Sequence, residues 1–220
     1  MEKIVIYHGS VNIVEMPIYG YGPTTNDYGQ GFYCTQDIIA AKEWANRKTR
    51  SGYVNKYSLD GENLTVLDLT SPDYSVLNWI AILMHNRELP NSFKLMYKKR
   101  LDFLEKYFYI DTTKYDIVIG FRADDAYFRF PLFFIQNEIS VERLEEIYKL
   151  GNLGKQIVLI SEKAFKHIKY ISSNLAEPFY HEQYVYRKDV ADKTFSRIRI
   201  EEINNDKEKL EDFIKAYDKH

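Results

Sequence analysis

The sequence predicts an α+β fold, on the basis of three observations. Short apolar runs rich in β-branched residues recur along the chain and have the length of strands. Other segments carry apolar residues at helical spacing and begin at capping residues. Strands and helices alternate irregularly, unlike the regular succession of a parallel α/β sheet, so we class the fold as α+β.

The first 45 residues are expected to form two strands and one helix. Residues 3–8 form an apolar run that predicts the first strand. Residues 9–29 are rich in Gly, Pro, Asn and Thr, and a loop of this length in a compact domain is often functional. Residues 31–35 predict a second strand. Asp37 is a candidate N-cap for a helix with apolar residues at Ile38, Ala41, Trp44 and Ala45.

The next segment is expected to form a hairpin and two helices. Residues 52–60 and 63–69 both alternate in polarity, and the Asp-Gly pair between them is typical of a hairpin turn. Pro72 follows a serine and predicts the first turn of a helix. We therefore expect helices over residues 73–87 and 91–108.

The segment from residue 115 to residue 171 is expected to contain two buried strands. "YDIVIG" predicts a strand over 115–120, and "KQIVLI" predicts another over 155–160. Helices are expected over 122–137, over 140–150 with Ser140 as its cap, and over 161–171 with Ser161 as its cap.

The chain is divided into a domain over residues 1–172 and an extension over 173–220 that we expect to pack on the same domain. Residues 172–179 are interpreted as a linker. Residues 180–187 ("YHEQYVYR") predict a strand, and the charged residues 201–220 predict a helical tail.

Composition indicates an ordinary globular protein of the cytoplasm. Hydrophobic residues make up 45% of the 220 residues, enough for a substantial core, and 28% are charged. The net charge of −2 does not favour a nucleic-acid partner, and it does not exclude one. Cys34 is the single cysteine, which fits a reducing compartment. No apolar run approaches the roughly 18 residues of a membrane span, and no signal peptide is recognisable, so we expect no membrane association.

Four phrases follow one another along the chain: "YHGS" at 7–10, "GQGFYCT" at 29–35, "YDIVIGFRADD" at 115–125 and "KQIVLISEKAF" at 155–165. Together they resemble the ADP-ribosyltransferase superfamily, on its diphtheria-toxin and poly(ADP-ribose) polymerase branch. They are most similar to an uncharacterised bacterial family of domains within it. The resemblance covers about residues 3–171. It implies a split β-sheet core with flanking helices, followed here by a helical C-terminal tail.

The resemblance also implies that NAD is the co-substrate and that no metal is needed. His8 would hold the ribose hydroxyls, for which a neutral imidazole offers one donor and one acceptor. Gly9 would let its backbone approach the nicotinamide amide, and Ser10 would support the turn. Gly31 would allow close approach of the loop.

Two aromatic residues would enclose the nicotinamide ring. Tyr33 would stack on one face, and Trp44, in the following helix, would cover the other. Each of these residues, taken alone, is more often part of a core than of a site. The ordered set of phrases favours the site, with His8, Tyr33 and Gln156 as its catalytic members.

Gln156 departs from the superfamily pattern, because that position in the late strand usually carries an acid. Glutamine can hold a ribose hydroxyl, but it is neither a base nor a negative charge. Asp124 and Asp125, after the strand at 115–120, are alternative carboxylates, although charges at a helix start would explain them equally well. Glu182, in the strand expected at 180–187, is a third alternative.

We therefore expect a mono-ADP-ribosyltransferase of bacterial toxin or phage-defence type, acting on a protein or nucleic-acid acceptor. The resemblance implies a small antitoxin-like protein as a further partner. Two alternatives remain open: a catalytically inactive module that senses NAD or binds a partner, and an NAD glycohydrolase.

Overall fold

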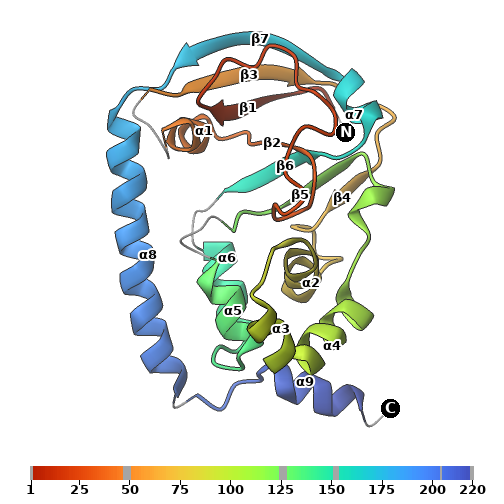
Figure 1. Cartoon of the computed structure of the whole chain (residues 1–220), viewed down its shortest axis with the longest axis vertical. Helices are drawn as coiled ribbons and strands as arrows, with labels where there is room; N and C mark the ends of the chain where they lie inside the picture. Colours follow the sequence, from red (N-terminus) through yellow and green to blue (C-terminus); the bar gives the residue numbers. More distant parts are fainter. Residues whose placement is uncertain (1, 47–50, 124–127, 151–153, 204, 219–220) are drawn as a thin grey trace.

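The computed structural model describes residues 2–46, 51–123, 128–150, 154–203 and 205–218. These residues form two β-sheets and nine α-helices, which confirms the α+β class (Figure 1).

The first sheet is antiparallel, with the strand order β1-β3-β7. Its strands are β1 (Ile4–Ser10), β3 (Tyr53–Leu59) and β7 (Ile168–Leu175). The predicted strand over 3–8 is therefore confirmed, and it extends two residues further. β3 is the central strand, and its side chains at Tyr57 and Leu59 are completely buried.

The second sheet has the order β2-β6-β5-β4, and only β4 and β5 run parallel. Its strands are β2 (Phe32–Cys34), β6 (Lys155–Leu159), β5 (Ile117–Phe121) and β4 (Val66–Asp68). β5 and β6 are covered on both sides, which explains their nearly continuous apolar sequences.

The two sheets meet where β1 passes the end of β2. The backbone N–H of Tyr7 donates to the carbonyl of Thr35 at 2.7 Å, and Thr35 N–H donates back to Tyr7 at 2.9 Å. This bridge places His8, the next residue, beside β2.

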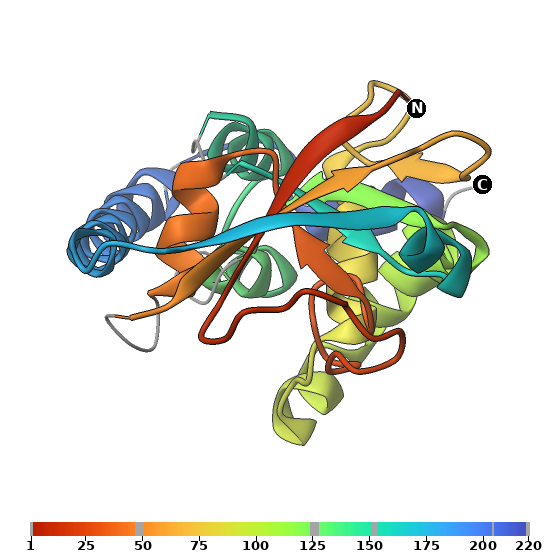
Figure 2. The same ribbon diagram turned by 90° about the horizontal axis from the view of Figure 1, so that it is seen from above.

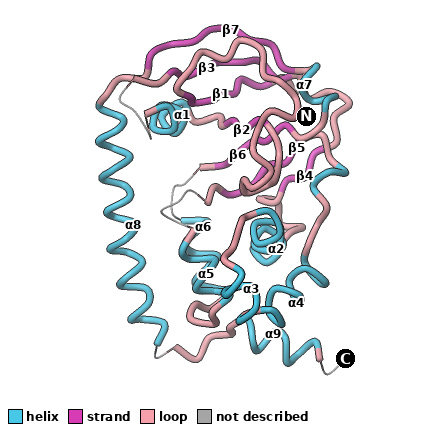
Figure 3. The backbone as a smooth tube through the Cα atoms, in the orientation of Figure 1, coloured by secondary structure: helices cyan, strands magenta, loops and turns pink. Residues whose placement is uncertain are grey.

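The helices lie mainly on the far side of the second sheet from the first (Figure 3). In chain order they are α1 (Ile38–Ala45), α2 (Val76–Asn86), α3 (Asn91–Met96), α4 (Lys98–Phe108), α5 (Arg129–Ile135), α6 (Val141–Leu150), α7 (Glu162–Lys166), α8 (Phe179–Ile203) and α9 (Leu210–Tyr217). Eight of the eleven residues of α2 are buried, so this helix forms the centre of the main core.

The long helix α8 runs along one side of the molecule, from α1 to the helices below the second sheet (Figure 1). Seen from above, it lies beside α1 (Figure 2). Lys42 of α1 forms an ion pair with Glu177 at 3.1 Å, just before α8, and Glu43 pairs with Arg187 within it.

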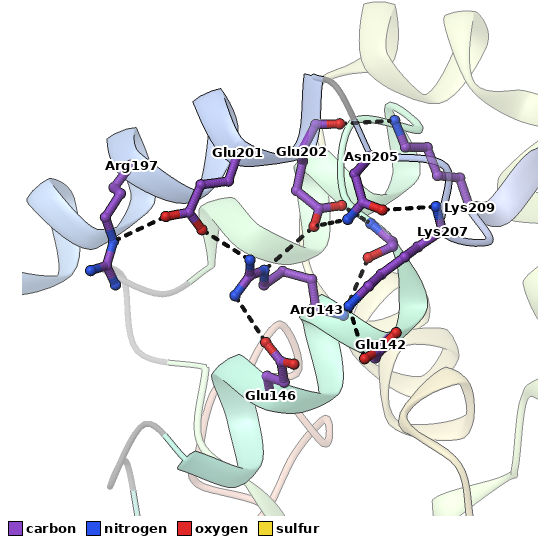
Figure 4. A network of polar contacts seen from close by, with 10 residues as sticks. Glu142, Arg143, Glu146, Arg197, Glu201, Glu202, Asn205, Lys207 and Lys209 are labelled. Atoms are coloured by element: carbon purple, nitrogen blue, oxygen red, sulfur yellow. Dashed lines mark hydrogen bonds and ion pairs between the residues drawn. The ribbon is translucent and has the colours of Figure 1, made fainter.

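The end of α8 is fixed by a polar network around Glu202, which is completely buried (Figure 4). Its carboxylate accepts hydrogen bonds from the backbone of Ser140 at 2.8 Å and from Asn205 at 2.9 Å. Arg143 of α6 contacts Glu202 and also pairs with Glu201 at 2.9 Å. Residues of the extension thus complete the cap of α6, whose predicted start at Ser140 is confirmed.

The expected hairpin over 52–60 and 63–69 is wrong, because its two strands belong to different sheets. Asp116, just before β5, explains the change of sheet. Its carboxylate accepts hydrogen bonds from the backbone N–H of Thr65 at 2.8 Å and from the Thr65 hydroxyl at 3.0 Å. These contacts attach β4 to β5 rather than to β3.

The expectations after residue 160 are only partly confirmed. Ser161 does cap a helix, since Ala164 N–H donates to its hydroxyl at 3.1 Å. That helix ends at Lys166, however, and β7 replaces most of the rest of the helix and the first half of the linker that we expected. β7 also runs across the boundary that the sequence suggested between residues 172 and 173.

The strand expected over 180–187 is wrong, because these residues lie in α8. The buried positions of α8 explain this result. Tyr184, Ala191, Phe195 and Ile198 recur at helical spacing and pack one face of the helix on the protein.

Two other helices begin later than expected. α2 starts after Ser75, which forms a capping box with Asn78, so Pro72 lies outside it. α5 starts at Arg129, and the expected helix start near residue 122 falls partly on residues 124–127, which are outside the described residues. The helix expected over 91–108 is divided at Tyr97 into α3 and α4.

Candidate functional site

A cavity of about 590 Å³ opens where the two sheets meet. Its walls are the end of β1, the loop that follows it, β2, single residues of α1 and β6, and residues that directly follow α2 and β5. Its volume is in the range of small-molecule sites.

All seven residues that the resemblance assigns to NAD binding line this cavity: His8, Gly9, Ser10, Gly31, Tyr33, Trp44 and Gln156. Six of them come from four elements and Gly31 from the loop just before β2, at positions up to 148 apart in sequence. Asp124 and Asp125 lie outside the described residues. Glu182 is exposed on α8 and does not line the cavity, so it does not hold the late-strand position.

His8 is held in one orientation. Its Nδ1 lies 2.8 Å from the carbonyl oxygen of Tyr33, and because a carbonyl only accepts, Nδ1 carries the proton. Phe32 supports the imidazole, with ring centres 4.4 Å apart. Burial lowers the pKa of His8, although the bond to Tyr33 favours the charged ring. The neutral ring therefore offers Nε2 as a hydrogen-bond acceptor.

Tyr33 is fixed by its hydroxyl. The hydroxyl donates to the carbonyl of Gly29 at 2.7 Å and accepts from the backbone of Tyr28 at 3.0 Å. Burial raises the pKa of Tyr33, so the phenol stays protonated. The contacts at the hydroxyl leave the ring, rather than the oxygen, as the surface that Tyr33 offers to a ligand.

Gln156 is the first buried residue of β6, with 5% of its surface exposed. Its side-chain oxygen Oε1 is buried and has no hydrogen-bond partner among the described residues. A buried acceptor without a partner costs about 1–3 kcal/mol. A ligand that donates a hydrogen bond in the cavity would remove this cost.

The two glycines have packing roles that the resemblance does not imply. A Cβ at Gly9 would lie 2.0 Å from the carbonyl oxygen of Ala41, so a glycine is needed for α1 to pack on β1. A Cβ at Gly31 would lie 2.7 Å from the side chain of Val158 in β6. Both residues shape the cavity by letting its walls come together.

Trp44 is half-buried in α1, and one face of its indole is in contact with Arg122. The guanidinium carbon of Arg122 lies 4.5 Å from the ring centre, which is a favourable cation–π distance. A ligand ring that stacks on Trp44 would share the side chain with this cation.

The cavity also contains charged residues that the sequence analysis missed. Asp27, Arg87 and Arg122 line it, and Asp27 is only 4% exposed. Arg87 follows α2, and its guanidinium pairs with Asp27 at 2.7 Å. An Asn-Asp pair in a Gly-rich loop is the only sequence signal for Asp27, and it is equally typical of a turn.

The rim of the cavity is apolar and exposed. The loop after β1 presents large side chains to solvent, including Met16 (81% exposed), Ile18 and Tyr21. The base of the loop is fixed by Asn55 of β3, which accepts a hydrogen bond from the backbone of Val14 at 2.9 Å. An exposed apolar group of this kind is typical of an interaction surface.

Among known families, the one described as "Protein of unknown function (DUF3990)" matches residues 4–170. The chain belongs to this DUF3990 family. This agrees with the expected membership of an uncharacterised domain family. No curated protein and no solved structure matches the chain significantly.

The DUF3990 match includes every residue that lines the cavity. It ends within β7, so α8 and α9 lie beyond it. Within the described part of the chain, no helix combines the length and the apolar character needed to cross a membrane. The described His, Cys, Asp and Glu residues include no cluster of three or more suited to a metal ion.

Proposed function

We propose that this DUF3990 protein is an NAD-dependent ADP-ribosyltransferase that transfers a single ADP-ribose to a macromolecular target. The observation that carries the proposal is the convergence of the seven residues on one cavity. The resemblance selected six of them by their place in short phrases and Trp44 by its place in the following helix, and the fold brings them together from separate elements.

The polar groups of the cavity fit the ribose of NAD. Nε2 of His8 and Oε1 of Gln156 are both acceptors, and Oε1 is buried with no hydrogen-bond partner in the part of the chain that the structure describes. Ribose hydroxyls are donors that would satisfy both. The rings of Tyr33 and Trp44 offer apolar surface to the nicotinamide ring.

The late strand of the proposed site has no carboxylate, so we propose transfer of one ADP-ribose rather than polymer synthesis. In the superfamily, the late-strand acid activates the ribose hydroxyl on which a polymer grows. The apolar rim around Met16 and Ile18 supports a macromolecular acceptor, because water would need no such surface. Control by a small antitoxin-like partner stays a prediction.

A second candidate is a module that binds NAD without turning it over. Gln156 favours it, since glutamine is a hydrogen-bonding group without basic character. An NAD glycohydrolase is the third candidate, in which water replaces the acceptor.

Incubation of the purified protein with labelled NAD and a bacterial lysate separates these functions. Label on a macromolecule, lost in His8→Ala and reduced in Gln156→Ala, supports the transferase. Free ADP-ribose without transfer supports a glycohydrolase, and NAD binding in calorimetry without turnover supports the binding module. Absence of both binding and turnover would refute the NAD proposal.

A further inference from the structure

Asp27 is a buried carboxylate in the wall of the cavity that contains His8 and Gln156. It lies in the long loop before β2, outside the phrases that carry the resemblance. A carboxylate is also the group that the site lacks at position 156. The question is whether Asp27 only stabilises the loop or also acts on a ligand.

The contacts of Asp27 leave one of its oxygens partly available. Oδ1 accepts a hydrogen bond from Arg87 Nε at 2.8 Å and forms an ion pair with its terminal nitrogen at 2.7 Å. Oδ2 accepts from the backbone N–H of Ala123 at 3.1 Å. A carboxylate has about four acceptor positions. Among the described residues, Oδ2 therefore keeps one position for a further donor.

The surroundings of Asp27 bring its pKa close to neutral pH, so that both its charged and its neutral form are accessible. Burial raises its pKa, whereas Arg87, the N–H of Ala123 and, more weakly, Arg122 lower it, with a result of about 6. The charge of Asp27 in turn adds to the burial that raises the pKa values of Tyr28 and Tyr33. A carboxyl group with a pKa near the working pH is suited to accept a proton.

We propose that Asp27 is the general base of the transfer reaction, in place of the absent late-strand acid, and that Arg87 positions it. This inference rests on the proposed function. The oxygen or nitrogen of the acceptor forms a bond to the ribose carbon that carries nicotinamide. The bond from that carbon to nicotinamide breaks, and its electron pair leaves with nicotinamide, which departs neutral. The proton of the acceptor passes to Oδ2 of Asp27 and from there to water.

The experiment measures nicotinamide release from NAD, with lysate as acceptor, between pH 5 and 8, together with NAD binding by calorimetry. In Asp27→Asn we expect turnover to fall by about 100-fold or more, which is the usual contribution of a general base. NAD affinity should change little, because His8 and Gln156 remain. Asp73→Asn, at an exposed carboxylate that does not line the cavity, is the matched control and should match the wild type.

Arg87→Gln distinguishes a base from a structural ion pair. The wild-type rate should rise with pH around a midpoint near 6. Removal of the Arg87 charge raises the pKa of Asp27 and removes the group that positions it, so the midpoint should move to higher pH and turnover at pH 8 should fall, but less than in Asp27→Asn. Thermal unfolding of each variant shows whether it is folded, and if Asp27→Asn fails to fold, the midpoint of Arg87→Gln decides.

Four results would overturn the inference. One is full turnover in folded Asp27→Asn, which would leave the transferase proposal intact. Another is an equal loss of turnover in Asp27→Asn and Arg87→Gln, with an unchanged pH midpoint in Arg87→Gln. The ion pair between Asp27 and Arg87 would then have a structural role only. A wild-type protein that binds NAD but never releases nicotinamide would overturn both this inference and the transferase. Absence of NAD binding would remove the NAD site altogether.

Discussion

Replacing Asp116 with asparagine should destabilise the protein at neutral pH and should make it less sensitive to acid. Asp116 is 8% exposed and lies at the junction of β4, β5 and α7. It accepts hydrogen bonds from the N–H and hydroxyl of Thr65 and, at 2.5 Å, from the hydroxyl of Ser161. Lys163 lies 3.5 Å away.

The magnitude follows from the pKa of Asp116. Burial raises this pKa, but the hydrogen bonds from Ser161 and Thr65 and the charge of Lys163 outweigh it and lower the pKa from 3.8 to about 2. At about 1.4 kcal/mol per pKa unit, ionisation of Asp116 contributes about 2.5 kcal/mol of stability at pH 7. Because the folded-state pKa is the lower one, this stability is present above pH 3.8 and is lost as the pH falls toward 2.

Urea unfolding at pH 7 and at pH 3 tests this reasoning. At pH 7 we expect Asp116→Asn to lose about 2–4 kcal/mol, since its amide would also leave donors of Thr65 and Ser161 unpaired. At pH 3 the difference should shrink by about 1 kcal/mol, because about half of the ionisation contribution has gone. Asp189→Asn, in an exposed pair on α8, should stay within about 0.5 kcal/mol of the wild type. An equal loss for Asp116→Asn at both pH values would refute the proposed origin of the stability.

Three further results are expected. Gly9→Ala should lower the unfolding temperature and weaken NAD binding. The new Cβ would lie 2.0 Å from the carbonyl oxygen of Ala41 and would displace α1 together with Trp44. Unchanged NAD binding in calorimetry would contradict this. NAD should change the tryptophan fluorescence of the wild type but not that of Trp44→Phe. The tryptophan that remains in the variant, Trp79, is completely buried and does not line the cavity. A fluorescence change kept in the variant would place the ligand elsewhere. A chain ending at Ala176 should lose cooperative thermal unfolding, because it lacks apolar side chains of the main core: Phe195, Ile198, Leu210 and Ile214. Burial of such side chains contributes about 1.5–3 kcal/mol each. A stable fragment would show that the extension is dispensable.

The strands that the sequence predicted correctly are those with the strongest local signal. β5 and β6 are buried on both sides and therefore read as short continuous apolar runs. β7 was missed because it is an edge strand with half-exposed, polar residues such as Ser172 and Ser173. Its structure depends on pairing with β3, more than 100 residues earlier, and no local pattern records that pairing.

Helix α8 shows the opposite error. Its first residues are aromatic and β-branched, which locally favours a strand. The whole segment is helical because Tyr184, Ala191, Phe195 and Ile198 lie on one face, and a window of eight residues is too short to reveal that spacing. Tertiary packing therefore overrides the local preference, and Glu182 is removed from the candidate site as a result.

The residues of the candidate site also differ in how well the sequence predicts them. His8, Tyr33 and Gln156, which lie in strands, are predictable from the resemblance, because it assigns roles to residues of its recurring phrases. Asp27 is not, because its place depends on contacts made by an irregular loop. The Tyr28 hydroxyl donates to the carbonyl of Phe121 at 2.6 Å, and Arg87 binds Asp27 from the end of α2. The same contacts give Asp27 both its burial and its cation. A carboxylate that is absent from the expected strand can therefore be supplied by a loop, and only the packing of that loop against α2 and β5 makes this visible.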